Sequence, residues 1–160
     1  MISITDLIMD ALAKNELDKF LRGDKPYSIK PNQWVAANVP TDWTVIIPQG
    51  IYEVYKHNSS INIKKIFEDT LIKMIFDDLG NLYVALNIIY NQLLWEHDNR
   101  AVFKIDRKKI MPLLTKKLYE KKTELENDFR WLGSGEPKGL WSEVLRIDSI
   151  LKDEMGHGVL

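Results

Sequence analysis

Apolar side chains recur every three to four residues along most of the chain, which is the spacing of one face of an α-helix. Near the N-terminus this pattern runs from residue 4 to about residue 21, and Asn15 is a predicted break between two short helices. Further helices are predicted at about 49–57, 61–79, 81–97, 107–125 and 140–155. The sequence therefore predicts a mainly α fold of six or seven helices.

The predicted helix at 81–97 differs from the others because it is apolar around most of its circumference, apart from a stripe at Asn87 and Asn91. A helix of this kind is usually surrounded by other elements. We expect it to follow a break at Gly80 and to form the centre of a helical bundle or of stacked α-hairpins. In the next helix, Asp106 is a predicted N-cap. Pro112 predicts a kink or a later start.

Residues 24–50 interrupt the helical pattern. Four of the six prolines lie here, together with two tryptophans and the β-prone stretch "WTVII" at 43–47. Proline disfavours both helix interiors and central strands. We therefore predict an irregular wrap with one short helix at 32–38 and one short strand. A loop is predicted at 133–139 and a frayed tail at 156–160.

Composition places the chain among ordinary globular proteins. It has 160 residues, of which 45% are hydrophobic and 28% charged, so residues 1–160 are expected to form one domain. It contains no cysteine, which excludes disulfides and thiolate metal sites and favours a reducing, cytoplasmic setting. The N-terminus lacks the features of a secretory signal, and the sequence has no apolar run long enough to span a membrane.

The stretch "WLGSGEPKGLW" at 131–141 has the glycines and lysine of a phosphate-binding loop. However, Lys138 precedes Gly139, Leu140 occupies the hydroxyl position, and the preceding residues form a charged helical stretch instead of a buried strand. A nucleotide site needs that strand-to-helix context. The interpretation we favour is a hinge between two helices.

The stretch "WEHDNR" at 95–100 is the densest group of titratable side chains. Metal ligands on a helix are spaced three or four residues apart, whereas Glu96, His97 and Asp98 are consecutive and diverge. The chain also lacks a Ser–His–Asp arrangement and the HExxH and EF-hand patterns. We therefore predict a non-enzymatic protein without catalytic, cofactor or metal residues, and no small-molecule substrate. A small enzyme using the Glu96–Asp98 region is an alternative.

Residues 101–122 carry eight basic and two acidic side chains, although the whole chain has a net charge of −1. This basic segment fits a solvated helix face, a surface for an acidic protein, or a nucleic-acid-binding face at 104–122. Its cations are Lys104, Arg107, Lys108, Lys109, Lys116, Lys117, Lys121 and Lys122.

From about residue 46 to residue 119 the order of features resembles small helical immunity proteins of bacterial polymorphic-toxin and contact-dependent inhibition systems. A proline-glycine entry into a short helix ("IPQGIYEVYKH") precedes two long helices, and an extended "FKID" leads into "RKKIMPLLTKKL". The resemblance implies a cytoplasmic protein that binds and neutralises one cognate toxin, often a nuclease. It supplies no functional residues by position.

We therefore expect an inhibitor of the immunity or antitoxin type, with a nucleic-acid-binding regulator that uses residues 104–122 as the alternative. Because many toxin targets are basic, an acidic surface is the predicted contact with the partner. Its predicted members are Asp77, Asp78, Glu96 and Asp98.

Overall fold

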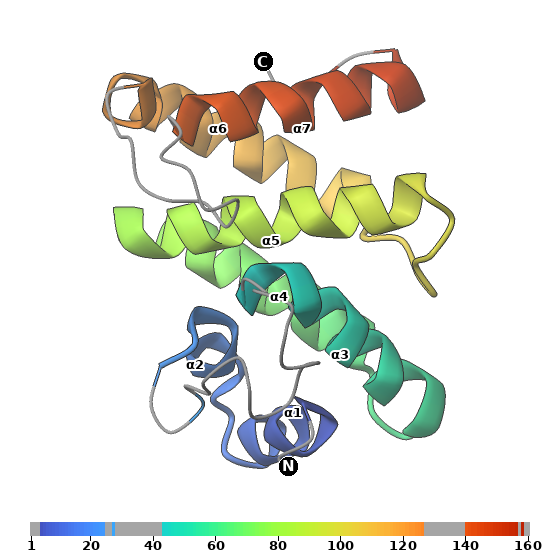
Figure 1. The fold of residues 1–160 in the computed structure, drawn as a ribbon. Helices are drawn as coiled ribbons and strands as arrows, with labels where there is room; N and C mark the ends of the chain where they lie inside the picture. Colours follow the sequence, from blue (N-terminus) through green and yellow to red (C-terminus); the bar gives the residue numbers. More distant parts are fainter. Residues whose placement is uncertain (1–3, 25–26, 28–42, 127–139, 157, 159–160) are drawn as a thin grey trace, which may run out of the picture.

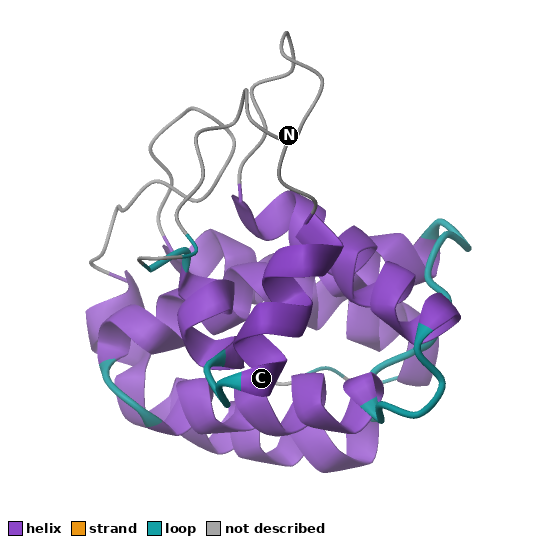
Figure 2. Ribbon diagram, turned by 90° about the horizontal axis from the view of Figure 1, so that it is seen from below, coloured by secondary structure: helices purple, strands orange, loops and turns teal. Residues whose placement is uncertain are grey.

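A computed structural model describes residues 4–24, 27, 43–126, 140–156 and 158 of the chain. Within these residues every regular element is an α-helix, and the helices are joined by turns and loops (Figure 2). The mainly α prediction is therefore confirmed. In chain order the helices are α1 Ile4–Ala13, α2 Leu17–Arg22, α3 Trp43–His57, α4 Ile63–Phe76, α5 Leu79–His97, α6 Arg107–Glu126 and α7 Leu140–Met155.

Helix α5 is the centre of the bundle, as the sequence predicts. It packs against α2, α3, α4 and α7, and it runs through the middle of the molecule between α7 and the N-terminal helices (Figure 1). Even its polar stripe is buried, because Asn87 and Asn91 are both under 10% exposed. The Asn91 side-chain amide donates to the backbone and side-chain oxygens of Asn87. This pairing satisfies polar groups that would otherwise be costly to bury.

An aromatic cluster joins α3 and α4 to the segment after α5. The Phe103 ring lies 5.2 Å from the Tyr52 ring and 6.4 Å from the Phe67 ring, both in edge-to-face geometry. Phe67 belongs to the buried face of α4, which the helical spacing of its apolar residues predicts. At the other side of α3, Gly50 lets α1 approach closely, since an added Cβ would lie 2.9 Å from the side chains of Ile4 and Ile8.

The boundary between α4 and α5 differs from the prediction. Gly80 lies inside α5, and the chain breaks instead at Asp77 and Asp78. The Asp78 carboxylate accepts a hydrogen bond from the Asn81 backbone N–H at 2.9 Å. An aspartate at this position satisfies a free N–H of the first turn, so it specifies the helix start more strongly than the glycine breaks it. The predicted break between the first two helices is confirmed, because Asn15 has a φ of 55°.

Helix α3 corrects the interpretation of the proline-rich segment. The β-prone stretch at 43–47 forms no strand, since α3 begins at Trp43 and continues through Pro48. Proline removes one backbone donor, a loss that burial of Ile47, Ile51 and Val54 along the same helix outweighs. Residues 25–26 and 28–42, including the predicted helix at 32–38, lie outside the described residues.

The C-terminal helices largely follow the prediction. Asp106 caps α6, because its carboxylate accepts from the backbone N–H groups of Lys108 and Lys109. Pro112 lies inside the helix, so the later start is not observed. In α7 the side chain of Leu145 is 50% exposed, whereas its neighbours Val144 and Ile147 are buried. The predicted loop at 133–139 and residues 157, 159 and 160 of the predicted tail lie outside the described residues.

Candidate functional site

The predicted acidic surface is divided between the two ends of α5. Asp77 and Asp78 precede the helix, and Glu96 and Asp98 lie at its end. A helix of 19 residues is about 28 Å long, so the two pairs cannot form one compact patch. The helix predicted at 81–97 already places the two pairs at its opposite ends, so this separation follows from the sequence.

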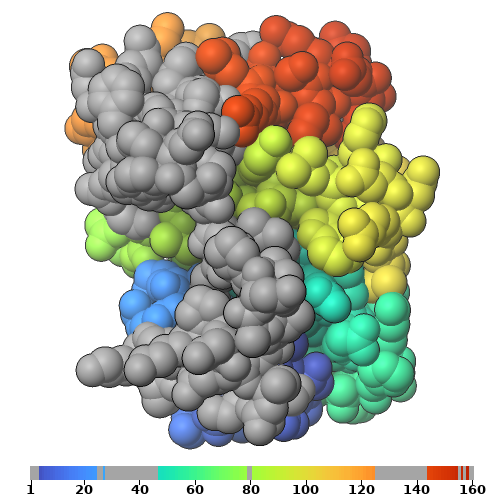
Figure 3. Space-filling view, in the orientation of Figure 1, coloured from blue at the N-terminus to red at the C-terminus, as the bar shows by residue number. Residues whose placement is uncertain are grey.

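Three of the four carboxylates are exposed, and two of them already serve α5. Asp78 caps the helix N-terminus, and Asp77 accepts a hydrogen bond from the side-chain amide of Asn81 at 2.7 Å. Asp98 is the residue that follows the last turn. The end of α5 and the turn after it reach the surface between α7 and α3, which is the yellow region of Figure 3. Asp98 itself is exposed.

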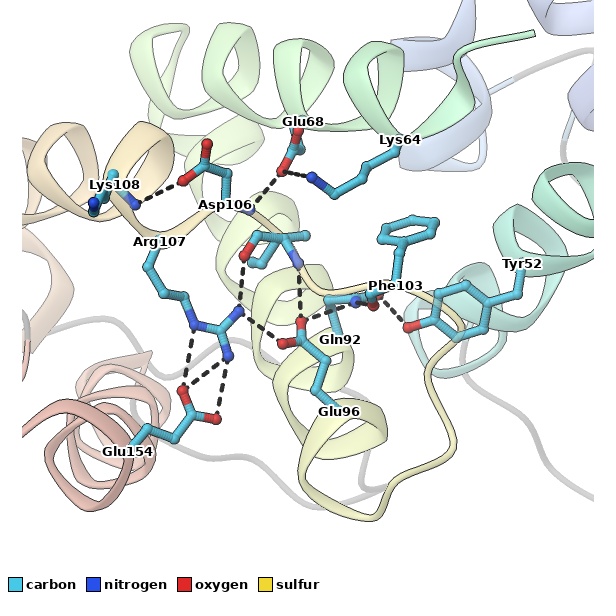
Figure 4. Close-up of polar contacts among 11 residues, drawn as sticks. Tyr52, Lys64, Glu68, Gln92, Glu96, Phe103, Asp106, Arg107, Lys108 and Glu154 are labelled. Atoms are coloured by element: carbon cyan, nitrogen blue, oxygen red, sulfur yellow. Dashed lines mark hydrogen bonds and ion pairs between the residues drawn. The ribbon is translucent and has the colours of Figure 1, made fainter. Parts of the chain in front are cut away.

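Glu96 is different, because its side chain is fully buried. One carboxylate oxygen, Oε2, accepts hydrogen bonds from Gln92 Nε2 at 2.9 Å and from the Ile105 backbone N–H at 3.3 Å. The other oxygen, Oε1, lies 2.7 Å from Arg107 Nη1, although no N–H group is aligned to donate to it. Glu96 therefore does not contribute to a contact surface. It is the centre of an internal polar cluster (Figure 4).

The cluster extends from Glu96 toward α3. Gln92 accepts a hydrogen bond from the Tyr52 hydroxyl at 2.5 Å and donates to the Phe103 carbonyl at 3.2 Å. Burial, together with the nearby negative charge of Glu96, raises the pKa of Tyr52 above its ordinary value. The hydroxyl therefore stays protonated at neutral pH and can donate to Gln92. We name this group, Tyr52, Gln92, Glu96, Arg107 and Glu154, the polar centre.

Arg107 connects the polar centre to α7. Its guanidinium lies between Glu96 and Glu154, with a shortest N–O distance of 2.9 Å to Glu154, and it also donates to the Ile105 carbonyl at 3.0 Å. A depression of about 370 Å³ beside it is lined by Lys104, Ile105, Arg107 and Glu154. Arg107 on α6 pairs with Glu96 on α5 and with Glu154 on α7, so these contacts connect the three helices. They leave neither Arg107 nor Glu154 available for a substrate.

A second set of carboxylates holds α4 against α6. The buried Glu68 accepts a hydrogen bond from the Asp106 backbone N–H, and Lys64 lies 3.6 Å from it. Lys109 pairs with Asp69 at 2.7 Å, and this hydrogen bond, with that of Lys65, lowers the pKa of Asp69. Sequence reasoning places Lys109 on a solvated basic face. Its pairing depends on where α4 lies beside α6. The periodicity of α6 alone does not predict that position.

A solvent-open apolar groove of about 480 Å³ lies between α1 and α4. The C-terminal half of α1 forms one wall and the outer face of α4 forms the other, with the start of α2 between them. We name it the α1–α4 groove, and its lining residues are Met9, Leu12, Ala13, Asn15, Leu17, Asp18, Ile61, Ile66, Thr70 and Lys73. Its volume lies in the range of natural binding pockets.

Charged side chains flank one end of the groove. Asp18 lies 3.3 Å from Arg22 and 3.6 Å from Lys73. Partial burial acts to raise the pKa of Asp18, but the positive charges of Lys73 and Arg22 outweigh it and lower the pKa. Asp18 is therefore ionised at neutral pH. The groove thus combines an apolar floor with a charged rim, an arrangement common in sites for apolar side chains of a protein partner.

Two observations limit the chemistry of the described residues. They contain no group of three or more His, Cys, Asp or Glu side chains arranged to hold a metal ion. None of their helices is both long and apolar enough to cross a membrane. His97 is exposed on the helix end, and His57 lies 3.3 Å from Glu53 on the surface of α3.

Comparisons with protein-family models, with curated proteins and with solved structures found no match to this chain.

Proposed function

We propose that the protein is a non-enzymatic inhibitor of the immunity type, which binds one cognate protein toxin and neutralises it in the cytoplasm. The observation that supports this proposal is the α1–α4 groove, an apolar depression that opens to solvent on a helical scaffold. Apolar pockets of this kind receive anchor side chains at protein interfaces. The immunity-like order of helices between residues 46 and 119 supports the same function.

The groove suits the proposed inhibitor better than the predicted acidic surface does. Asp77 and Asp78 stand about 28 Å from Asp98, whereas the groove brings side chains from three helices to one place. Exposed carboxylates at the rim of an interface mainly steer association, and buried apolar contacts hold the complex. We therefore assign the acidic residues Asp77, Asp78 and Asp98 a steering role at most.

The proposal is tested by filling the groove. Ala13 lines it and is exposed, so Ala13→Trp places an indole in the depression without removing a core side chain. Asp6→Trp is the matched control, because Asp6 is an exposed residue of the same helix that does not line the groove. Circular dichroism verifies that both variants keep the helical content of the wild type.

Tagged wild type and both variants are used to capture proteins from nuclease-treated lysate of the source cells. The expected result is one stoichiometric protein on the wild type and on Asp6→Trp, with roughly tenfold less on Ala13→Trp, a difference of about 1.4 kcal/mol. Equal capture by all three samples would exclude the groove as the contact. A parallel capture is made from lysate without nuclease. If the wild type then retains nucleic acid but no protein, the result would favour the alternative function at residues 104–122.

A further inference from the structure

The lysines among the described residues differ in whether they form an ion pair with a carboxylate. Nine of them lie within 4 Å of a carboxylate, namely Lys14, Lys19, Lys56, Lys64, Lys65, Lys73, Lys109, Lys121 and Lys152. By contrast, Lys104, Lys108, Lys116 and Lys117 form no ion pair with any described residue. Among the described residues, the lysines without an ion pair are therefore confined to the 14 positions from Lys104 to Lys117, in and just before α6.

Helical geometry places two of these lysines on one stripe of α6. Residues 108, 112, 116 and 119 fall within about 80° around the helix axis and span about 16 Å along it. Lys108, Pro112, Lys116 and Tyr119 are all exposed, whereas Ile110, Leu114 and Leu118 on the opposite side are buried. Lys104 is exposed just before the helix, and the half-buried Lys117 lies off the stripe. We name Lys104, Lys108, Pro112, Lys116 and Tyr119 the lysine–tyrosine face.

Tyr119 is the most exposed large hydrophobic residue among those described, with 68% of its surface accessible. Tyrosine is enriched in the cores of protein interfaces, where its ring buries a large area at little conformational cost. The face therefore offers cations without an ion pair among the described residues and an exposed aromatic ring.

We infer that the lysine–tyrosine face is a docking surface for an acidic segment of a protein. Such a segment would place carboxylates against Lys108 and Lys116, about two helical turns apart, and an apolar side chain against Tyr119. The inference goes beyond the proposed function, because the face belongs to α6 and shares no residue with the α1–α4 groove. A test that disproves one of these two surfaces therefore does not decide the role of the other.

The charges favour an acidic protein segment over nucleic acid. Arg107, the one arginine of the basic segment, is held by Glu96 and Glu154, and Lys109 is held by Asp69. Arginine and closely spaced cations are the groups that best follow a phosphate backbone.

The experiment titrates the full chain with three labelled probes and follows fluorescence anisotropy. The probes are poly-glutamate, a random copolymer of glutamate and tyrosine, and oligothymidylate. The copolymer should bind most tightly, since it supplies both carboxylates and rings. Lys108→Glu with Lys116→Glu should weaken binding of both polypeptides by about fivefold or more. Tyr119→Ala should weaken binding of the copolymer only.

The matched control is Lys14→Glu with Lys19→Glu, which changes the net charge by the same amount at exposed lysines just after α1 and on α2, at the other end of the molecule from α6 (Figure 1). The control should bind the copolymer as the wild type does. If both double variants weaken copolymer binding equally, the effect depends only on net charge, and the inference is overturned. Tighter binding of oligothymidylate would identify a nucleic-acid surface instead, and no binding of any probe at low salt would also overturn it.

Discussion

The most informative perturbation of this fold is replacement of Arg107 by methionine. The guanidinium is only 15% exposed and lies between a fully buried carboxylate, Glu96, and a partly exposed one, Glu154. Arg107→Met keeps much of the aliphatic volume but leaves the Glu96 charge inside the protein without a cation. Burial of an unpaired charge is among the few single changes that destabilise a domain severely.

The expected loss of stability follows from the two contacts. Removing one partner of a buried ion pair costs about 3–5 kcal/mol. The contact with Glu154 contributes up to about 1 kcal/mol, since that side chain is 27% exposed and solvent screens it. The free energy of unfolding of a domain is about 5–15 kcal/mol, so this loss of stability would be a large fraction of the total. The two contacts together amount to about 3–6 kcal/mol, so the melting temperature should fall by roughly 6–24 °C, because a domain of this size loses about 2–4 °C per kcal/mol.

A double-mutant cycle separates the ion pair from the packing of the arginine. Glu96→Gln removes the charge but keeps an oxygen that can accept from Gln92 and from the Ile105 N–H. Combined with Arg107→Met, it should restore roughly half of the lost stability, since no unpaired charge remains. Urea unfolding followed by circular dichroism measures each free energy.

Arg100→Met is the control for this cycle. Arg100 is an exposed arginine on the turn after α5 that stacks over Trp95 at 4.7 Å. Its replacement should cost less than about 1 kcal/mol. If Arg107→Met costs no more than Arg100→Met, and the cycle shows no coupling, then the polar centre does not hold α5, α6 and α7 together as described.

Three further predictions concern single contacts. Tyr52→Phe should cost about 1–3 kcal/mol in urea unfolding, because the buried Gln92 oxygen loses its donor, and a cost near zero would contradict that hydrogen bond. Asp78→Ala should cost about 1 kcal/mol by removing the α5 cap, whereas Asp98→Ala should be nearly neutral. The pKa of Asp18 lies below its ordinary value of 3.8, so its stabilising effect is complete above about pH 5 and is lost as pH falls through the folded-state pKa. Asp18→Asn should therefore flatten the acid side of the stability–pH curve, and an unchanged slope would contradict the shift.

Much of the helical architecture could be predicted because helical periodicity is a local signal. The circumference of the 81–97 helix is apolar, and this alone identifies α5 as the central element. Local chemistry also predicts the break at Asn15 and the cap at Asp106. The start of α3 was missed because Pro48 and the β-branched residues before it disfavour a helix locally. Burial of Ile47 and Ile51 overrides that preference, and burial depends on elements distant in sequence.

The polar centre could be predicted only in part. Gln92 and Glu96 are one turn apart on an otherwise apolar helix, which is a usable signal for a buried polar pair. In the sequence, however, Glu96 stands in the charged stretch "WEHDNR", which indicates a solvated helix end. Its burial results from Arg107 and Ile105 folding back over the end of α5, and from Glu154 on α7. Contacts between residues up to 47 positions apart leave no trace in a local periodic pattern.

The basic segment shows why the net charge of a stretch of sequence is a poor guide to its role. The same helix directs Arg107 and Lys109 toward carboxylates of neighbouring helices and leaves Lys108 and Lys116 without an ion pair among the described residues. The first two should therefore affect stability, whereas the second two should affect only association. Because adjacent residues point about 100° apart, this division between Arg107 and Lys108 is a direct consequence of the helix. A charge reversal at 108 that unfolds the protein, or one at 107 that leaves its stability unchanged, would contradict it.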